Sequence, residues 1–180
     1  GLANRSSFQA RLAALDVGVL VLIDLDGFKQ INDLFGHALG DECLREVGQR
    51  LNTICRGAEL VARIGGDEFA VLLQGHRDQT GIEMIAQQIV DALSRPVKRN
   101  DGLLRVGASV GIAAIDDSLK PAELFTRADA ALYAAKAAGR NTFRLFSPDM
   151  MVIGHASAPP LASANIAKPD RRRFRGSASA

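Results

Sequence analysis

The chain has 180 residues, 47% of them hydrophobic, and a formal net charge of +2 at pH 7. This length fits one domain, and the composition supplies enough apolar material for a buried core. Residues 147–180 hold five of the 22 basic and two of the 20 acidic residues, so residues 1–146 are near neutral, which argues against a nucleic-acid-binding function.

The first predicted element is an amphipathic helix at the start of the chain. Phe8, Leu12 and Leu15 recur at the spacing of one helix face. Asn4 and Ser6 precede this stripe as capping candidates, so the helix should begin near them.

A buried strand follows directly. Residues 17–24, VGVLVLID, form an apolar run that ends in a carboxylate, the pattern of a central strand covered on both faces. Asp24 would then lie at the C-terminal end of that strand. Residues 27–42 predict a short helix, a loop bracketed by Gly36 and Gly40, and the start of a second helix. The second helix carries one apolar stripe, made of Leu44, Val47, Leu51 and Ile54.

The middle of the chain predicts a β-hairpin. Leu60 to Ile64 and Phe69 to Leu73 are strand-like and are separated by Gly65-Gly66-Asp67-Glu68. The two glycines permit backbone angles that other residues resist. Alone, such a turn is more often a solvated hairpin than a functional site.

A third helix and a long strand come next. Thr80 and Glu83 form a capping box ahead of the helix, and Pro96 ends it. Residues 100–102, Asn-Asp-Gly, are a turn signal. Residues 103–115, LLRVGASVGIAAI, then predict one long strand.

A last helix and a short strand complete the core. Pro121 is placed to start the helix and Gly139 to stop it, and Thr142 to Phe146 predict the strand. The fold class is therefore α/β, with a mostly antiparallel, mixed sheet of about five strands flanked by helices. We expect a domain over residues 1–146 and a disordered, basic Ala/Ser/Pro-rich tail over residues 147–180.

The cysteines and the hydropathy indicate a cytoplasmic location. Cys43 and Cys55 lack metal-ligand spacing, so we expect both to be reduced. The longest apolar run, Val17 to Ile23, is far shorter than the about 20 residues of a membrane span, and no signal peptide is visible. We therefore expect no membrane contact from this segment.

Asp24 and Asp67 are the first candidates for chemistry. A central strand and its neighbouring hairpin could bring the two carboxylates to one edge of the sheet. Mg²⁺ prefers oxygen ligands and is usually held by one or two carboxylates together with substrate phosphates. The glycines of the turn leave room for a nucleotide to approach the backbone closely.

Three longer motifs carry a resemblance to a known family. They are DLDGFKQINDLFGHALGDE at residues 24–42, RIGGDEF at residues 63–69 and ADAALYAAKAAGRN at residues 128–141. Together they resemble the GGDEF family of diguanylate cyclases over residues 2–146. The family has a palm-like nucleotide-cyclase fold and condenses two GTP molecules into cyclic di-GMP, with release of pyrophosphate.

The resemblance implies a metal and catalytic centre. Asp24, the Leu25 carbonyl and Asp67 would bind two divalent ions, Mg²⁺ or Mn²⁺, in each active site. The catalytic residues would be Asp67, Glu68 and Asp24, with Glu68 assisting deprotonation.

The resemblance also implies how GTP binds. Asn32 and Asp41 would read guanine through an amide and a carboxylate, although either could simply cap a helix. Phe28 would shape the pocket together with Leu25. The phosphate-binding group would consist of Lys29, Lys136 and Arg140, with Gly65 and Gly66 giving access to the backbone.

Several neighbouring residues have structural interpretations instead. We interpret His37 as holding its turn through a backbone hydrogen bond and Ser109 as strand packing. Tyr133 and Phe125 are expected in the core rather than in contact with a ligand.

One motif departs from the family. Many members carry an inhibitory product site, Arg-x-x-Asp, where this chain has Arg56-Gly57-Ala58-Glu59. The longer Glu59 side chain moves the carboxylate outward by one methylene. We expect product inhibition through Arg56 and Glu59 to be weak or absent.

Catalysis would require a homodimer, because each GTP must supply both a nucleophile and an electrophile. The resemblance further implies an upstream sensory domain in the full protein. An alternative is a catalytically silent GTP-binding module that regulates a neighbouring domain. A more distant one is another nucleotide cyclase.

Overall fold

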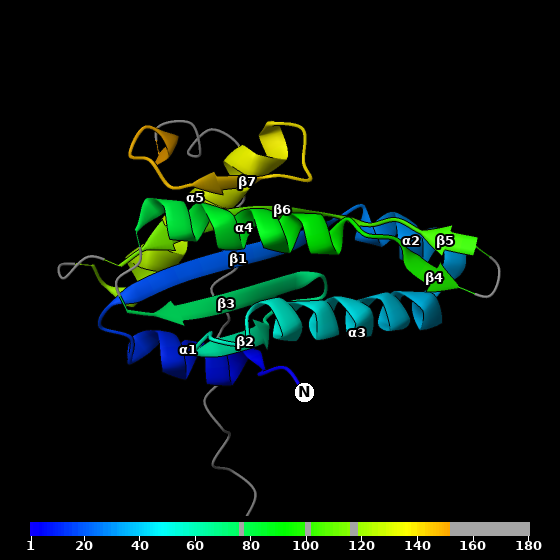
Figure 1. Cartoon of the computed structure of the whole chain (residues 1–180), viewed down its shortest axis with the longest axis horizontal. Coiled ribbons are helices and arrows are strands. Elements are labelled where there is room, and N and C mark those ends of the chain that lie inside the picture. Colours follow the sequence, from blue (N-terminus) through cyan, green and yellow to red (C-terminus); the bar gives the residue numbers. More distant parts are fainter. Residues whose placement is uncertain (76–77, 100–101, 116–118, 152–180) are drawn as a thin grey trace, which may run out of the picture.

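The computed structural model describes residues 1–75, 78–99, 102–115 and 119–151. Helices and strands are interspersed along this part of the chain (Figure 1). The helices are α1 (Arg5–Ala13), α2 (Phe28–Phe35), α3 (His37–Ile54), α4 (Gln79–Leu93) and α5 (Pro121–Ala137). The strands are β1 (Gly18–Asp26), β2 (Leu60–Arg63), β3 (Glu68–Gln74), β4 (Val97–Arg99), β5 (Gly102–Leu104), β6 (Gly107–Ala114) and β7 (Phe143–Leu145).

Strand β1 lies at the centre of a five-stranded sheet with the order β2-β3-β1-β6-β7. It pairs antiparallel with β3 on one side and β6 on the other, as its unbroken apolar sequence predicts. The β2–β3 pair is also antiparallel, while β6 and β7 are parallel. The predicted mixed sheet of five strands is confirmed.

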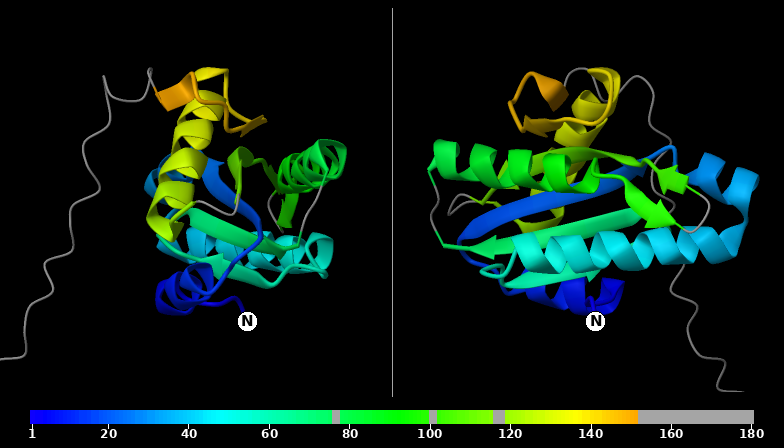
Figure 2. Two further views of the ribbon diagram at one scale, coloured as in Figure 1. Left: turned by 90° about the vertical axis from the view of Figure 1, so that its left-hand side faces the viewer. Right: turned by 45° about the vertical axis from the view of Figure 1, so that its right-hand side comes forward.

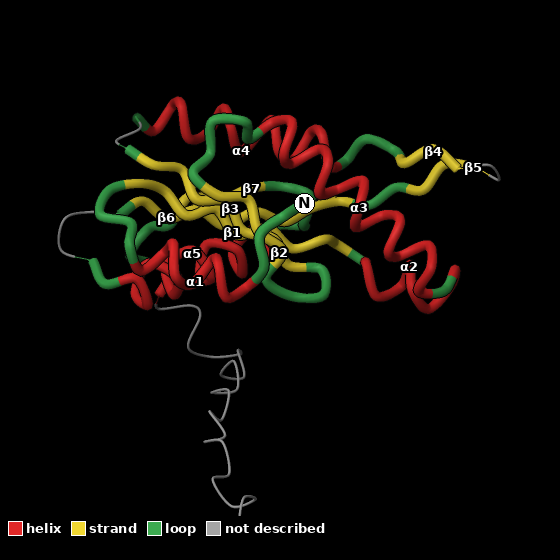
Figure 3. The backbone as a smooth tube through the Cα atoms, turned by 90° about the horizontal axis from the view of Figure 1, so that it is seen from below, coloured by secondary structure: helices red, strands yellow, loops and turns green. Residues whose placement is uncertain are grey.

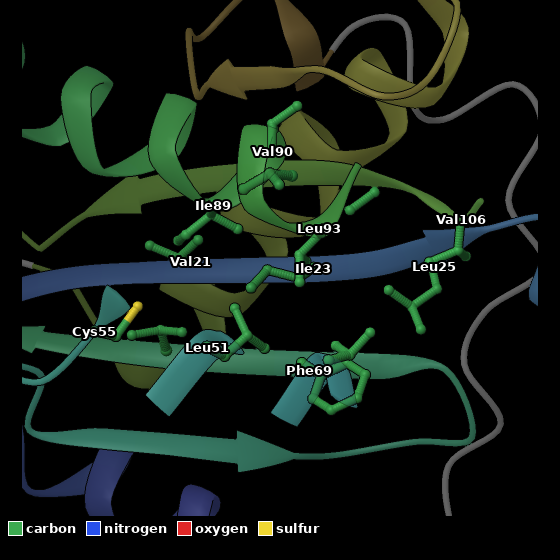
Figure 4. Packing of buried hydrophobic residues seen from close by; sticks show 14 of the residues in the cluster. Val21, Ile23, Leu25, Leu51, Cys55, Phe69, Ile89, Val90, Leu93 and Val106 are labelled. Carbon is green, nitrogen blue, oxygen red and sulfur yellow. The ribbon is translucent and has the colours of Figure 1, made fainter. Parts of the chain in front are cut away.

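Helices cover both faces of the sheet. Figure 3 shows α3 and α4 on one side and α1 and α5 on the other. Because side chains alternate along a strand, Val21 and Ile23 of β1 pack under α3 and α4 with Leu51 (Figure 4), whereas Leu20 and Leu22 lie in the second cluster. Each fully buried Leu or Ile side chain stabilises the fold by about 1.5–3 kcal/mol.

The two cysteines lie in the first of these clusters. Cys43 and Cys55 are buried free thiols, as expected. Burial raises the pKa of the Cys55 thiol to about 11. In the part of the chain that the structure describes, no helix combines the length and the apolarity of a membrane span.

Helix α5 packs directly onto the backbone of β6 at Gly111. A Cβ atom on Gly111 would overlap the carbonyl oxygen of Ala128 and the backbone nitrogen of Leu132. The facing residues of α5 are small as well, since Ala128, Ala131 and Ala135 are all fully buried. This close approach fixes the height of α5 above the sheet.

Two sequence predictions for the helices are wrong in detail. The loop bracketed by Gly36 and Gly40 is absent, because α3 already begins at His37 and Gly40 is buried within it. Gly36 alone makes the turn, with φ 83° and its N–H donating to the Asn32 carbonyl at 2.8 Å. Likewise, Asp78 rather than Thr80 caps α4, accepting the Gly81 N–H at 3.0 Å.

The strand predicted over residues 103–115 is also interrupted. It divides into β5 and β6 at Arg105 and Val106, and β5 turns back to pair with β4, a strand that was not expected. This hairpin and α2 lie at the same end of the molecule (Figure 2). Asn100 and Asp101 of the predicted turn fall outside the described residues.

The last described segment ends at Met151, so most of the tail predicted from residue 147 lies outside the described residues. Phe125 packs edge-to-face on Phe8 with ring centroids 6.3 Å apart, as expected for the core. Tyr133 is different: it is 40% exposed, so its predicted core position is wrong.

We expect Gly111→Ala to lower the free energy of unfolding by about 1–3 kcal/mol, because the added methyl group meets the unyielding α5 backbone. Urea denaturation measures this change. The matched control is Gly57→Ala, where a Cβ meets nothing within 4 Å and the change should stay within about 0.5 kcal/mol. Equal stability of Gly111→Ala and the parent chain would contradict the close packing.

Candidate active site

Three carboxylates gather where β1 meets the β2–β3 hairpin. Asp24 of β1 lies directly opposite Glu68 of β3 in the antiparallel pairing, so both side chains project from the same face. The Leu25 N–H donates to the Asp67 carbonyl at 3.2 Å, which ties the hairpin turn to β1. In an antiparallel ladder the N–H and C=O of one residue face the same neighbour, so the Leu25 carbonyl also faces the hairpin.

The negative charge of these three carboxylates is only partly offset by a neighbouring lysine. Burial raises the pKa of Asp24, and the nearby Asp67 and Asp26 carboxylates add to that effect. Burial likewise raises the pKa of Glu68, with further contributions from Asp24 and Asp67. Lys136 of α5 opposes both shifts, and its Nζ lies 2.8 Å from Asp24 Oδ2.

The hairpin turn is held by a side chain that the sequence analysis did not single out. Arg63 donates to the Gly65 carbonyl at 3.2 Å and to the Gly66 carbonyl at 2.8 Å. Its position, two residues before the paired glycines, was the available signal. Through these bonds the Arg63 guanidinium group holds the turn that carries Asp67 and precedes Glu68.

One of the two roles predicted for the glycines of the turn, their freedom of backbone angle, is wrong. Neither Gly65 nor Gly66 has a positive φ, so backbone freedom is not what the turn requires of them. At Gly65 a Cβ atom would overlap the Glu68 carboxylate. At Gly66 a Cβ would meet nothing within 4 Å, so the absent side chain leaves open space beside the acidic group.

Helix α2 begins immediately after β1. Its N-cap, Gly27, is left-handed with φ 75° and offers no side-chain cap, so the first N–H groups of α2 are available to an anion. Phe28 is buried and Lys29 is exposed at this end of the helix.

The junction of α2 and α3 holds an unpaired polar atom. Within the described residues Asn32 Oδ1 is buried and accepts no hydrogen bond. It lies against Gly40, where a Cβ atom would overlap it. Asp41 follows on α3 and is exposed. An amide oxygen in this position is suited to accept a hydrogen bond from a ligand.

Helix α5 ends in a Schellman motif. The N–H groups of Gly139 and Arg140 donate back to the carbonyls of Lys136 and Ala135, at 3.4 and 3.3 Å. Gly139 has φ 106°, as its predicted stop position requires. Arg140 lies just beyond this end and is exposed, one turn after Lys136.

A groove of about 880 Å³ runs between α1, α5 and the sheet. It reaches Glu68 and Lys136 at one end, while Phe8, Leu12 and Phe125 form much of its apolar wall. Glu68 and Lys136 therefore lie on a concave surface. A groove of this size is in the range of small-molecule sites.

Comparisons with known proteins identify the family of this chain. A family model described as "Diguanylate cyclase, GGDEF domain" matches residues 1–142. The chain belongs to the GGDEF family. This GGDEF domain is 40% identical over 157 residues to the "Probable diguanylate cyclase DgcE" of Escherichia coli K12, which covers 82% of the chain and 14% of DgcE. It thus corresponds to a small part of that longer relative.

Solved structures show the same fold. The GGDEF domain of TpbB from Pseudomonas aeruginosa matches with a TM-score of 0.78 and 35% identity, covering 84% of this chain and 94% of that one. The GGDEF domain of DgcB from Caulobacter crescentus, in complex with cyclic di-GMP, matches with a TM-score of 0.73 and 30% identity, covering 80% and 91%. The palm-like cyclase fold is therefore confirmed for this GGDEF domain.

The two residues of the expected product site differ in their surroundings. Arg56 is exposed, while Glu59 forms an ion pair with Arg11 of α1. The Glu59 carboxylate is thus engaged between α1 and the start of β2. Weak product inhibition of the GGDEF domain stays a prediction.

The structure brings some of the expected site residues into one group and leaves others further along the rim. Asp24, Asp67, Glu68 and Lys136 interact electrostatically. Asn32 and Asp41 belong to the α2–α3 pair, connected to this group through Gly27. Ser109 is buried as expected, but its hydroxyl also donates to Asp26 at 2.7 Å, and Asp26 was not singled out from the sequence.

Removing the Lys136 charge should raise the Asp24 pKa further, because Lys136 is the main influence that lowers it. NMR titration of the Asp24 carboxyl group in Lys136→Met measures this shift. The raised pKa means that the Asp24 contribution to stability is present below its ordinary pKa and is lost as the pH rises through the folded value.

Lys120→Met is the matched control, since Lys120 precedes the same helix and is not among the charges acting on Asp24. Its Asp24 titration should coincide with that of the parent chain. A lower Asp24 pKa in Lys136→Met would contradict the ion pair.

Proposed function

We propose that this GGDEF domain is an active diguanylate cyclase, which condenses two GTP molecules into cyclic di-GMP and releases one pyrophosphate from each. The observation that carries the proposal is the meeting of Asp24, Asp67 and Glu68 with Lys136 at one rim of the sheet. Carboxylates for a metal and a cation for phosphates are what nucleotidyl transfer needs side by side.

The donor set fits Mg²⁺, the ion that the family normally uses. Asp24, Asp67 and the Leu25 carbonyl would hold two ions. Burial raises the pKa of Asp24, the Asp67 and Asp26 carboxylates raise it further, and a divalent cation would offset their charge. Among the described residues, no group of three or more His, Cys, Asp or Glu side chains could hold a metal. Substrate phosphates would complete the coordination of the ions. When bound, Mg²⁺ lowers the pKa of an attacking hydroxyl and offsets phosphoryl charge.

The triphosphate would lie between α2 and α5. The uncapped N-terminus of α2 offers backbone N–H donors, and Lys29 is exposed in its first turn. Lys136 approaches from the last turn of α5, and Arg140 approaches from the Schellman turn that follows the helix. On phosphate binding Lys136 would exchange its Asp24 partner for phosphate oxygens.

Guanine would be read at the α2–α3 junction. Among the described residues, Asn32 Oδ1 is buried without a hydrogen-bond partner, and it could accept a hydrogen bond from an N–H group of the guanine base. Asp41 would accept from the same edge of the base. Adenine presents a different pattern of donors and acceptors, so it would leave these groups unsatisfied.

The reaction needs two copies of the domain. The 3′-hydroxyl of each GTP attacks the α-phosphate of the other, which forms two new P–O bonds and breaks two bonds to pyrophosphate. A two-fold arrangement places both pairs of reacting atoms at once. Glu68, with its raised pKa, lies beside the metal ligands and would assist the loss of the hydroxyl proton.

Incubation of the domain with GTP and Mg²⁺ at high protein concentration should yield cyclic di-GMP, detected by chromatography of the products. Asp67→Ala should lower the rate at least about 100-fold, because it removes a metal-binding carboxylate. Asp91→Ala is the matched control, since Asp91 is an exposed carboxylate on α4.

A parent domain that binds GTP but forms no product, even when fused to a dimerising partner, would be a regulatory GTP-binding module instead of a cyclase. A product made from ATP would point to another nucleotide cyclase.

We expect Asn32→Ala to raise the KM for GTP about 10-fold, the effect of one lost hydrogen bond in a desolvated site. Turnover of GTP over a range of concentrations measures this change, with ATP turnover as the reference for base selectivity. Asn52→Ala, an exposed amide on α3, should leave the KM unchanged. An unchanged KM in Asn32→Ala would remove Asn32 from guanine recognition.

A further inference from the structure

Asp26 has no part in the chemistry described so far, yet both of its carboxylate oxygens are engaged. Oδ1 accepts the Ser109 hydroxyl of β6 at 2.7 Å, and Oδ2 accepts the backbone N–H of Asn141 at 2.8 Å. Asp26 lies on β1 two residues after Asp24, and therefore on the same face of the sheet. It thus connects the strand of the acidic group to the segment that follows α5.

That segment has an uncommon backbone. Gly139, Arg140 and Asn141 have φ angles of 106°, 63° and 45°, so two consecutive residues other than glycine are left-handed. Such residues are few in folded proteins and persist where the surroundings hold them.

The Asn141 side chain makes further hydrogen bonds that hold the same turn. Its Oδ1 accepts the Ser94 hydroxyl at the end of α4, at 2.6 Å, and the Ala108 N–H of β6 at 3.4 Å. Gly107 leaves space for this arrangement, because a Cβ there would lie 3.1 Å from both Asn141 Oδ1 and Asp26 Oδ2. Asn141 is therefore hydrogen-bonded to β1, to β6 and to the end of α4.

We propose that Asp26 is a positioning residue, which holds the turn after α5 so that Arg140 faces the triphosphate site formed next to Asp24. The inference rests on the proposed function, since Arg140 is assigned to phosphates there. One strand then carries both the metal-binding carboxylate and the anchor for the phosphate-binding arginine. Asp24 and Asp26 are two residues apart on β1, so the strand itself sets the distance between the metal-binding carboxylate and the anchor.

A fourth carboxylate next to the acidic group could also be a metal ligand, and the two roles make different predictions. As an anchor, Asp26 can be replaced by asparagine, because the amide oxygen still accepts the Asn141 N–H and the NH₂ group can donate to Ser109 Oγ. As a metal ligand, it could not be replaced in this way.

The first test measures binding of 3′-deoxyGTP, which lacks the attacking hydroxyl and so binds without turnover. We expect Asp26→Ala to weaken its affinity about 10-fold, while Asp26→Asn stays within about threefold of the parent domain. Equal weakening by both substitutions would overturn the positioning role. If Asp26→Ala does not fold, Asp26→Ser, whose side chain is too short to reach Asn141, takes its place.

The second test asks whether Asp26 acts through Arg140. In an Arg140→Ala background, Asp26→Ala should change the affinity by less than about twofold, because residues that act as one unit are not additive. A loss of affinity for 3′-deoxyGTP of about 10-fold in both the parent and the Arg140→Ala background would show that Asp26 does not act through Arg140. Asp91→Ala, with its exposed carboxylate on α4, serves as the control in each series.

The third test needs no ligand. Amide hydrogen exchange at Asn141 should be faster in Asp26→Ala than in Asp26→Asn, since only the alanine removes the acceptor of that N–H. An unchanged exchange rate of the Asn141 amide in Asp26→Ala would show that Asp26 does not hold this N–H group. A parent domain that fails to bind 3′-deoxyGTP would instead refute the proposed function, and the exchange result would still decide the role of Asp26.

Discussion

The opposition of Asp24 and Glu68 across two central strands is the constraint on which the site depends. Cβ atoms of directly opposite residues lie about 4.5–5.5 Å apart, and like charges in such a pair are unfavourable. Partial burial adds to that cost and raises the pKa of both groups. The fold tolerates this arrangement because Lys136 lies against Asp24. An arrangement unfavourable for folding and suited to cations is typical of a functional site.

The other parts of the site are positioned through β1. This strand pairs with β3 and β6, so the hairpin lies on one side of it and the strand before α5 on the other. Helix α2 continues directly from its C-terminal end. Segments more than 100 residues apart in the chain, such as Asp26 and Asn141, therefore meet at one edge. The similarity to solved GGDEF domains extends across most of the chain, as expected when the framework and the site share one strand.

The sequence predicted the architecture because its strongest patterns are local. The apolar run of β1, the hairpin and the stop at Gly139 each follow from a few neighbouring residues. The break between β5 and β6 was missed because Arg105 and Val106 fit a continuous strand, and only the pairing with β4 divides it. Asp26 was missed for a related reason: its partners, Ser109 and Asn141, come from distant segments that no local pattern connects.

The contact at Gly111 determines which kind of motion the domain allows. Helix α5 touches the β6 backbone itself, with no layer of side chains between them that could repack. Sliding or tilting of α5 would therefore separate two backbones in direct contact, and Lys136 would move with them. The part of the candidate site that α5 carries should therefore resist deformation. In the proposed reaction, control would then act on how often, and in which orientation, two copies of the domain meet.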